Sequence, residues 1–245
     1  MTRLIYGMFI SFVLTPVHLA GAQNFHDAML KLHKQYQGQS DLSIAMNVNA
    51  FETESASTPY YEVHVAIKKS EQNYRYQMGS NEMLMNDKYI IMVDHSLKEV
   101  VWSRRDPSTE TDFKEKIKFN LDSILNFYED GRYVGTKDNI DNYSVLQKTG
   151  DIRKIDLYID RSSDLLTRLT YGYRSNQFVS IDFLHFESKP AFDKNTFDEH
   201  YFFQSGRNTP SLSSRFTGYR LIDVNDKKNR SAVTPKRGEK KISKN

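Results

Sequence analysis

The histidines of this chain are its residues best suited to hold a metal or to transfer a proton at neutral pH. His26 and His33 lie seven positions apart, too far for the four-residue spacing of a metal pair on one helix. Four others fall on separate predicted elements: His64, His95, His185 and His200. Because the chain has no cysteine, a zinc site would need histidines and carboxylates from several elements. We expect no metal site and no cofactor.

The carboxylates and serines give no pattern that is diagnostic of catalysis. Asp138, Asp141 and Asn142 form a polar cluster, but they lack the spacing and the glycine of a calcium-binding loop, so we interpret them as a turn. Glycine-rich phosphate loops, Gly-x-Ser-x-Gly elbows and paired acidic motifs are absent from the sequence. We therefore predict that the protein is not an enzyme.

Large apolar side chains are abundant, with 15 Phe, 15 Tyr and 8 Met. Aromatic rings and flexible thioethers suit a surface that binds apolar chains. The same residues would also build an ordinary core, and the sequence leaves both alternatives open. Which alternative holds depends on the helices and strands that carry these residues.

Residues 1–22 have the features of a secretory signal peptide. Arg3 supplies the positive region, Leu4–Leu14 the apolar region, and Ala20-Gly21-Ala22 a small-residue cleavage site before Gln23. The apolar run is shorter than the about 20 residues of a membrane helix, and Pro16 interrupts it. After cleavage we predict a protein without a membrane span.

The cysteine count bears on the compartment. A lipoprotein needs a cysteine at its new N-terminus, and this chain has none. Secreted domains of this size often carry disulfides, whereas a periplasmic domain large enough to build a core can fold without them. We therefore predict a periplasmic protein, with secretion as the second choice, and we expect a monomer.

Charge is distributed unevenly along the chain. Residues 226–245 contain eight basic and two acidic residues, a net charge of +6, although the whole chain carries only +3. The exported body is therefore mildly acidic, which together with export argues against a nucleic-acid partner. The tail lacks hydrophobic periodicity, and we predict that it is disordered.

A short amphipathic helix is predicted first. Its stripe, with Asn24 as N-cap and Gly38 as stop, consists of Phe25, Ala28, Met29, Leu32 and Tyr36. Strict alternation then predicts strands at Leu42–Val48 and Tyr61–Ile67, followed by Tyr74–Met78.

Three apolar runs, Met83–Met85, Tyr89–Val93 and Val100–Trp102, are separated by residues that favour turns. This pattern predicts a strand meander. Neighbouring as well as alternate positions are apolar, which indicates that both faces of the sheet leave water here. A second layer must therefore cover the other face, and a helical lid is our hypothesis for it.

A helical stripe after Pro107 predicts one or two further helices at 110–130: Phe113, Ile117, Leu121, Ile124, Leu125 and Tyr128. Strands return after Gly131, at Tyr133–Thr136, Tyr143–Lys148, Ile152–Ile159, Leu165–Tyr173 and Phe178–Phe186.

These elements predict a mainly β, α+β fold. About eleven strands joined by short turns should form an antiparallel sheet that curls into an open half-barrel, covered by two or three helices. We place this domain at 23–204, a C-terminal extension at 205–225 and the disordered basic tail at 226–245.

This order of elements resembles the LolA/LolB-like superfamily. The resemblance spans 24–203 and is carried by QYQGQSDLSIAMNV (35–48), MNDKYIIMVDHSLKEVVW (85–102), IRKIDLYIDRSSDLLTRLTY (152–171) and SIDFLHFESKPAFDKNTFDEHYF (180–202). It implies a half-barrel, and the missing cysteine makes the soluble carrier the better likeness. Carriers of this group use a buried arginine to hold the lid closed. Arg75, Arg104, Arg153 and Arg168 are the candidates, and none carries a motif that assigns the role.

Our hypothesis is an exported carrier of the bacterial envelope that holds the acyl chains of a lipid or lipoprotein between sheet and helices. The residues predicted to line the cavity are Phe25, Met29, Leu32, Ile44, Met46, Val48, Val63, Val65, Ile67, Tyr74, Tyr76, Ile117, Leu121, Ile124 and Leu125. The alternative is a non-catalytic sensing or structural module with a filled interior that binds an envelope protein, for example by strand addition.

Overall fold

The computed structural model describes residues 25–36, 39–106, 131–204 and 210–224. Its elements in chain order are α1 (Phe25–Tyr36), β1 (Asp41–Phe51), β2 (Tyr61–Ser70), β3 (Asn73–Met78), β4 (Asn81–Met85), β5 (Tyr89–Asp94), β6 (Glu99–Arg104), β7 (Arg132–Lys137), β8 (Ile140–Leu146), β9 (Ile152–Asp160), β10 (Leu165–Tyr173), β11 (Phe178–Ser188), the 3-10 helices η1 (Glu199–Tyr201) and η2 (Ser214–Phe216), and β12 (Arg220–Asp223).

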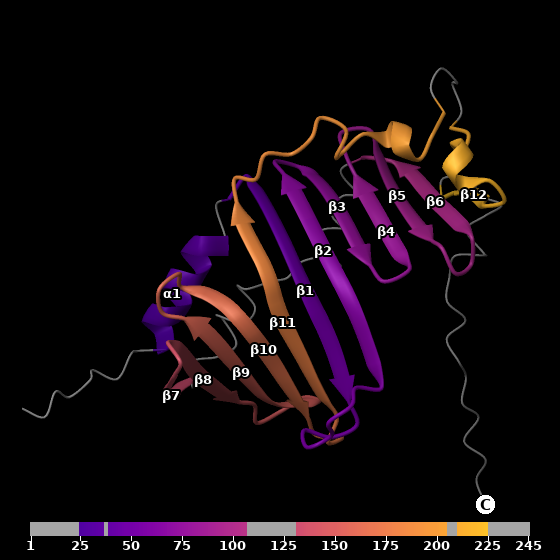
Figure 1. The fold of residues 1–245 in the computed structure, drawn as a ribbon. Helices are drawn as coiled ribbons and strands as arrows, with labels where there is room; N and C mark the ends of the chain where they lie inside the picture. Colours follow the sequence, from indigo (N-terminus) through magenta and orange to yellow (C-terminus); the bar gives the residue numbers. More distant parts are fainter. Residues whose placement is uncertain (1–24, 37–38, 107–130, 205–209, 225–245) are drawn as a thin grey trace, which may run out of the picture.

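All twelve described strands belong to one sheet, in the order β12-β6-β5-β4-β3-β2-β1-β11-β10-β9-β8-β7. Two antiparallel meanders, β1 to β6 and β7 to β11, meet where β1 pairs with β11. Short turns dictate this topology, because they place each strand beside its sequence neighbour. The sheet curves strongly and does not close (Figure 1), which confirms the predicted open half-barrel.

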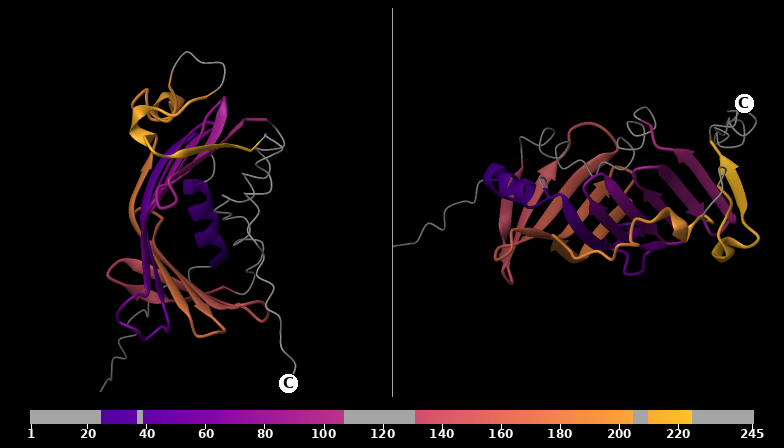
Figure 2. Two further views of the ribbon diagram at one scale, coloured as in Figure 1. Left: turned by 90° about the vertical axis from the view of Figure 1, so that its right-hand side faces the viewer. Right: turned by 90° about the horizontal axis from the view of Figure 1, so that it is seen from above.

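Helix α1 lies on the concave side of the sheet (Figure 2). Its predicted stripe faces inward, and Phe25, Met29 and Leu32 are buried in a core with side chains of β8, β9 and β10. Asp27 in the first turn and His33 and Lys34 in the last complement the helix dipole. The helix therefore covers the concave face at the β8–β10 end.

The convex face is covered elsewhere, over β4, β5 and β6. After β11 the chain runs along the ends of the central strands to this region (Figure 1). There Phe202, Phe203 and Phe216 form a second core. Its sheet members are Leu84, Ile91, Val93, Val100 and Trp102. These strands are apolar on both faces, as the sequence predicts. On the convex face the cover is the C-terminal segment, which sequence reasoning did not foresee.

Two predicted details are corrected by the structure. It has twelve strands where we expected about eleven, because β12 lies within the extension predicted at 205–225 and pairs with β6 in parallel. The described residues contain one α-helix, the predicted α1, and the other predicted helices fall outside them. The turn after β7 is made by Asp138 and Asn139, whereas Asp141 and Asn142 belong to β8. Their strand register, fixed by pairing with β9, overrides their turn propensity.

Several predictions lie outside the described residues: the signal peptide, the helices at 110–130 with Ile117, Leu121, Ile124 and Leu125, and the basic tail. In the part of the chain that is described, no helix has the length and apolarity that a membrane crossing requires.

Candidate functional site

The candidate site is the apolar surface on the concave face of the central strands, which we call the trough. On β1 the alternate residues Leu42, Ile44, Met46 and Val48 face this side. Register places Ile67, Val65 and Val63 of β2 opposite Ile44, Met46 and Val48. On β3 to β5 the surface continues through Tyr74, Tyr76, Met78, Met83, Met85 and Ile90.

A β-bulge on β11 adds two phenylalanines to the trough. Met46 pairs with Phe183 and Ala45 with His185, so Leu184 is left without a partner residue on β1. Strict alternation would put Phe183 and Phe186 on opposite faces, because they are three positions apart. The extra residue restores the phase, so both rings face the trough while Leu184 is more than half exposed.

Tyr36, the last residue of α1, lies where the α1 core meets the trough and contacts both. Its ring centroid is 4.8 Å from that of Phe186. Burial raises the pKa of the Tyr36 phenol to about 12. The Leu166 backbone N–H approaches the phenol oxygen and lowers the pKa in part. The hydroxyl proton has no acceptor of ordinary geometry among the described residues, so a buried donor is left at this end of the trough.

The eleven predicted cavity residues that the structure describes divide into two groups. Phe25, Met29 and Leu32 fill the α1 core, where they contact β8 to β10. Eight others are gathered in the trough: Ile44, Met46, Val48, Val63, Val65, Ile67, Tyr74 and Tyr76. Tyr36 is the one described non-strand residue that contacts the central cluster of the trough.

Sequence reasoning missed the trough residues of β4, β5 and β11. Met83, Met85 and Ile90 stand in runs that are apolar at consecutive positions, so alternation does not say which face each occupies. Phe183 and Phe186 were missed because the bulge breaks the two-residue period. Pairing with β1 would have revealed the bulge, but a single sequence does not contain that pairing.

The candidate arginines Arg75 and Arg168 lie on the convex face, opposite the trough. Arg75 stacks on Tyr201 at 4.4 Å from the ring centroid and forms an ion pair of 3.0 Å with Glu82. Glu82 also bonds His95, whose other ring nitrogen is 2.8 Å from the Tyr219 hydroxyl. These contacts fasten the C-terminal segment to the sheet.

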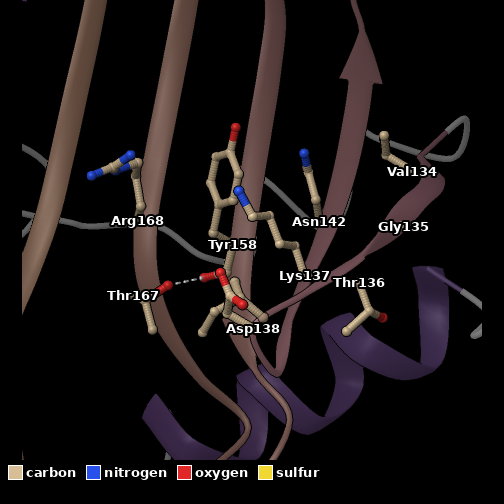
Figure 3. Close-up of a pocket in the computed structure, with 10 residues that line it drawn as sticks. Val134, Gly135, Thr136, Lys137, Asp138, Asn142, Tyr158, Thr167 and Arg168 are labelled. Atoms are coloured by element: carbon tan, nitrogen blue, oxygen red, sulfur yellow. Dashed lines mark hydrogen bonds between the residues drawn. The ribbon is translucent and has the colours of Figure 1, made fainter.

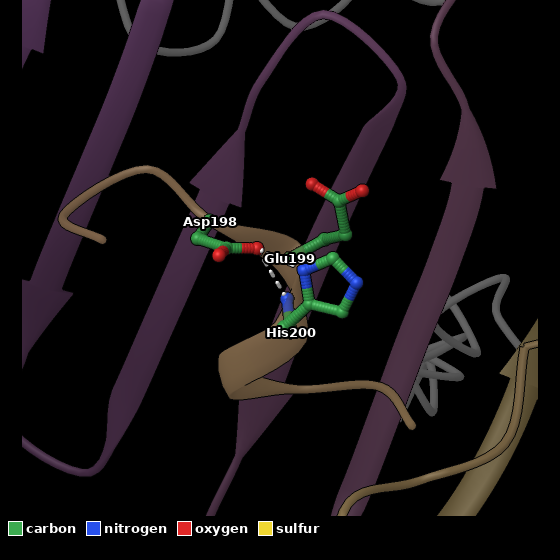
Figure 4. A group of neighbouring side chains, drawn as sticks. All are labelled: Asp198, Glu199 and His200. Atoms are coloured by element: carbon green, nitrogen blue, oxygen red, sulfur yellow. Dashed lines mark hydrogen bonds and ion pairs between the residues drawn. The ribbon is translucent and has the colours of Figure 1, made fainter. Parts of the chain in front are cut away.

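Asp198, Glu199 and His200 are a group of side chains that could approach a metal (Figure 4). Their carboxylates bond to neighbouring groups of the protein instead. The Asp198 carboxylate accepts from the His200 backbone and caps η1. Glu199 accepts from Lys88 at 2.6 Å and from Asn86 at 2.8 Å. The group therefore serves to anchor the segment after β11 to the turn between β4 and β5.

Fold and trough together define an open, curved β half-barrel with an apolar concave face. No family model and no curated protein matches the sequence. The chain is similar in structure to lipoprotein LppX of Mycobacterium tuberculosis, with 9% identity, 68% of this chain and 96% of that chain covered, and a TM-score of 0.43. It is also similar to a LolA superfamily protein of Nitrosomonas europaea, with 10% identity, 72% of this chain and 98% of that chain covered, and a TM-score of 0.32. A further similar structure is the MucA/MucB complex of Pseudomonas aeruginosa, with 15% identity, 76% of this chain and 63% of that chain covered, and a TM-score of 0.43.

Proposed function

We propose that the protein is an exported, non-catalytic carrier in the bacterial envelope that holds the acyl chains of a lipid or lipoprotein in the trough. The observation that supports this proposal best is the continuity of the apolar concave surface across β11 and β1 to β5. Its rows of Val, Ile, Met and Phe run from strand to strand, together with Tyr74 and Tyr76.

Burial of an acyl chain would supply enough free energy for such binding. Each methylene group that leaves water contributes about 0.8 kcal/mol, so a sixteen-carbon chain contributes roughly 12 kcal/mol before the costs of association. Methionines at 46, 78, 83 and 85 supply side chains that adapt to ligands of different shape.

Tyr36 gives the trough a polar end. A buried hydroxyl without a partner costs about 1–3 kcal/mol. An ester or amide carbonyl of an acylated ligand would accept its hydrogen bond and recover that cost. We therefore place the acyl linkage near Tyr36 and the hydrocarbon along β1 and β2.

Native mass spectrometry of the protein purified from an envelope fraction tests the proposal. Bound species with acyl-chain masses are the expected result. A clean apo mass, together with no binding of a fluorescent fatty acid by the same preparation, would contradict it.

Two variants on β2 test whether the ligand binds in the trough or elsewhere on the sheet. Ile67 faces the trough, and its neighbour Ala66 faces the convex side. Ile67→Lys should weaken fatty-acid binding about tenfold or more, because it puts an ammonium group in the path of the hydrocarbon. Ala66→Lys is the matched control and should bind like the parent. Equal losses in both variants would argue against the trough.

A second candidate is supported by the edge of the sheet. Among the described strands β7 pairs with β8 alone, and its Tyr133 and Val134 are exposed. Such an edge accepts an extended segment of a protein partner by strand addition. An envelope protein that binds with equal affinity to Ile67→Lys and to the parent would favour this function over the carrier.

A further inference from the structure

A pocket of about 580 Å³ lies on the convex side of the β7–β10 end, a volume within the range of small-molecule sites. Its residues come from four adjacent strands and the β7–β8 turn (Figure 3). They are Val134, Gly135, Thr136, Lys137, Asp138, Ile140, Asn142, Tyr158, Thr167 and Arg168.

A cross-strand row forms one side of this pocket. Register pairs Asn142 with Tyr158 and Tyr158 with Arg168, so the three side chains stand next to one another on β8, β9 and β10. Figure 3 shows Asn142 and Tyr158 extending side by side in one direction. On β7 the row ends at Gly135, where an added Cβ would meet nothing within 4 Å. The missing side chain leaves the space open.

Two cations line the pocket. Arg168 is held by Asp182 through Nε, which leaves the two terminal nitrogens of its guanidinium without a partner among the described residues. Lys137 has no ion-pair partner among them either. Asp182 does not line the pocket, and the one carboxylate that does belongs to Asp138. The free donors therefore favour an anion.

Unpaired neutral groups accompany these cations. The buried Oδ1 of Asn142 has no hydrogen-bond partner. Ser144 Oγ, at the next position on the same face of β8, is also buried without one. Buried polar atoms are nearly always paired, and each unpaired one costs about 1–3 kcal/mol. The amide nitrogen of Asn142 lies at the outer end of the side chain (Figure 3), where it would donate to a hydroxyl of a ligand, and the Tyr158 ring offers an apolar face beside it.

From this arrangement we propose that the pocket binds a small hydroxylated anion, of the chemical class of a sugar phosphate. The phosphate would lie between Lys137 and Arg168, and the hydroxyl groups would lie toward Asn142 and Tyr158. The trough is on the opposite face of the sheet, so this ligand is separate from the proposed acyl cargo.

The test is titration calorimetry of the full chain with glucose 6-phosphate at low ionic strength, since added salt screens exposed charges. We expect measurable binding of glucose 6-phosphate, weaker binding of inorganic phosphate and none of glucose. Binding of glucose as tight as that of its phosphate would overturn the assignment of an anion, as would the absence of heat with both phosphates at about 10 mM.

Charge-neutralising variants locate the site. Lys137→Gln and Arg168→Gln should each weaken glucose 6-phosphate binding about five- to tenfold. Arg132→Gln is the matched control, because Arg132 is exposed on the same strand as Lys137 but does not line the pocket. Thermal unfolding of each variant checks that it folds. An equal loss in Arg132→Gln would indicate diffuse surface attraction and overturn the proposal.

Discussion

Asn86 is a buried side chain that joins the turn between β4 and β5 to the C-terminal segment. Its amide nitrogen donates to the Phe197 carbonyl at 3.1 Å and to Glu199 at 2.8 Å. Its oxygen accepts from the backbone of Lys88 and Tyr89, at 3.0 and 2.9 Å. No other residue type places two donors and an acceptor at these positions on so short a stem.

Asn86→Ala should therefore lower the free energy of unfolding by about 2–3 kcal/mol, because it leaves two backbone N–H groups and one carbonyl without their partners. Urea denaturation measures the change. Asn81→Ala, at the exposed start of β4, should stay within about 0.5 kcal/mol of the parent. A similar small loss in Asn86→Ala would show that water replaces these bonds.

Asp160 gives a prediction about acid stability. Hydrogen bonds from the Ser162 side chain and from Ser163 lower the pKa of its carboxyl to about 2, from an ordinary value of 3.8. A folded-state pKa below the unfolded value stabilises the fold above pH 4, and this contribution is lost as the pH falls toward 2. Asp160→Asn should be less stable than the parent at pH 6, and the difference should vanish near pH 2.

Denaturation curves between pH 2 and pH 7 check this expectation. Asp151→Asn, in the turn at the other end of β9, serves as the control and should follow the parent over the whole range. A stability difference for Asp160→Asn that persists unchanged at pH 2 would contradict the role of the carboxylate.

At the scale of elements, the contact between β6 and the C-terminal segment contains the single tryptophan of the chain, Trp102 of β6. Trp102 is 5% exposed, and the ring of Phe203 lies edge-on to it with centroids 6.0 Å apart. Phe203→Ala should cost about 3–5 kcal/mol and shift the Trp102 emission to longer wavelength, because water reaches the indole. Ile67→Lys, on the opposite face, should leave the emission spectrum unchanged.

Much of this fold follows from local patterns in the sequence. Alternation assigns the side chains of β1 and β2 to the correct faces of the sheet, and the apolar stripe of α1 identifies the buried side of the helix. The apolar runs of β4 to β6 correctly indicate a sheet covered on both faces. These features are local, so single residues and their immediate neighbours carry them.

The rest depends on pairing between distant parts of the chain. The cover over β4 to β6 comes from residues more than 90 positions later, where Phe202 and Phe216 stand in polar surroundings without a period. β12 is four residues long and pairs in parallel, so it has too few positions to show alternation. The convex pocket depends on the cross-strand row from Asn142 to Arg168, which only the register creates.

For the whole molecule, the pairing of β1 with β11 is the contact that joins the two meanders. It runs over ten residue pairs, from Leu42 with Ser188 to Phe51 with Phe178. These strands lie at the centre of the sheet and have partners on both sides, whereas β7 has a partner on one side among the described strands. The centre should therefore open only when the whole domain unfolds.

Native-state hydrogen exchange tests whether local stability falls from the centre of the sheet to β7. Amides of β1 and β11 should exchange at the rate of global unfolding, and those of β7 should exchange faster by several orders of magnitude through local opening. Uniform protection across all strands would show instead that the sheet opens as a single unit.

The parallel pairing of β12 with β6 has a consequence for self-association. An uncovered outer strand presents unpaired N–H and C=O groups that can template growth into fibrils. β12 occupies those groups on β6 from residues 220 to 223, and Arg220 and Glu99 add an ion pair across the joint. A chain that ends before this strand would keep most of its sheet but leave the backbone groups of β6 unpaired. Shortened forms should therefore polymerise at concentrations where the intact protein does not.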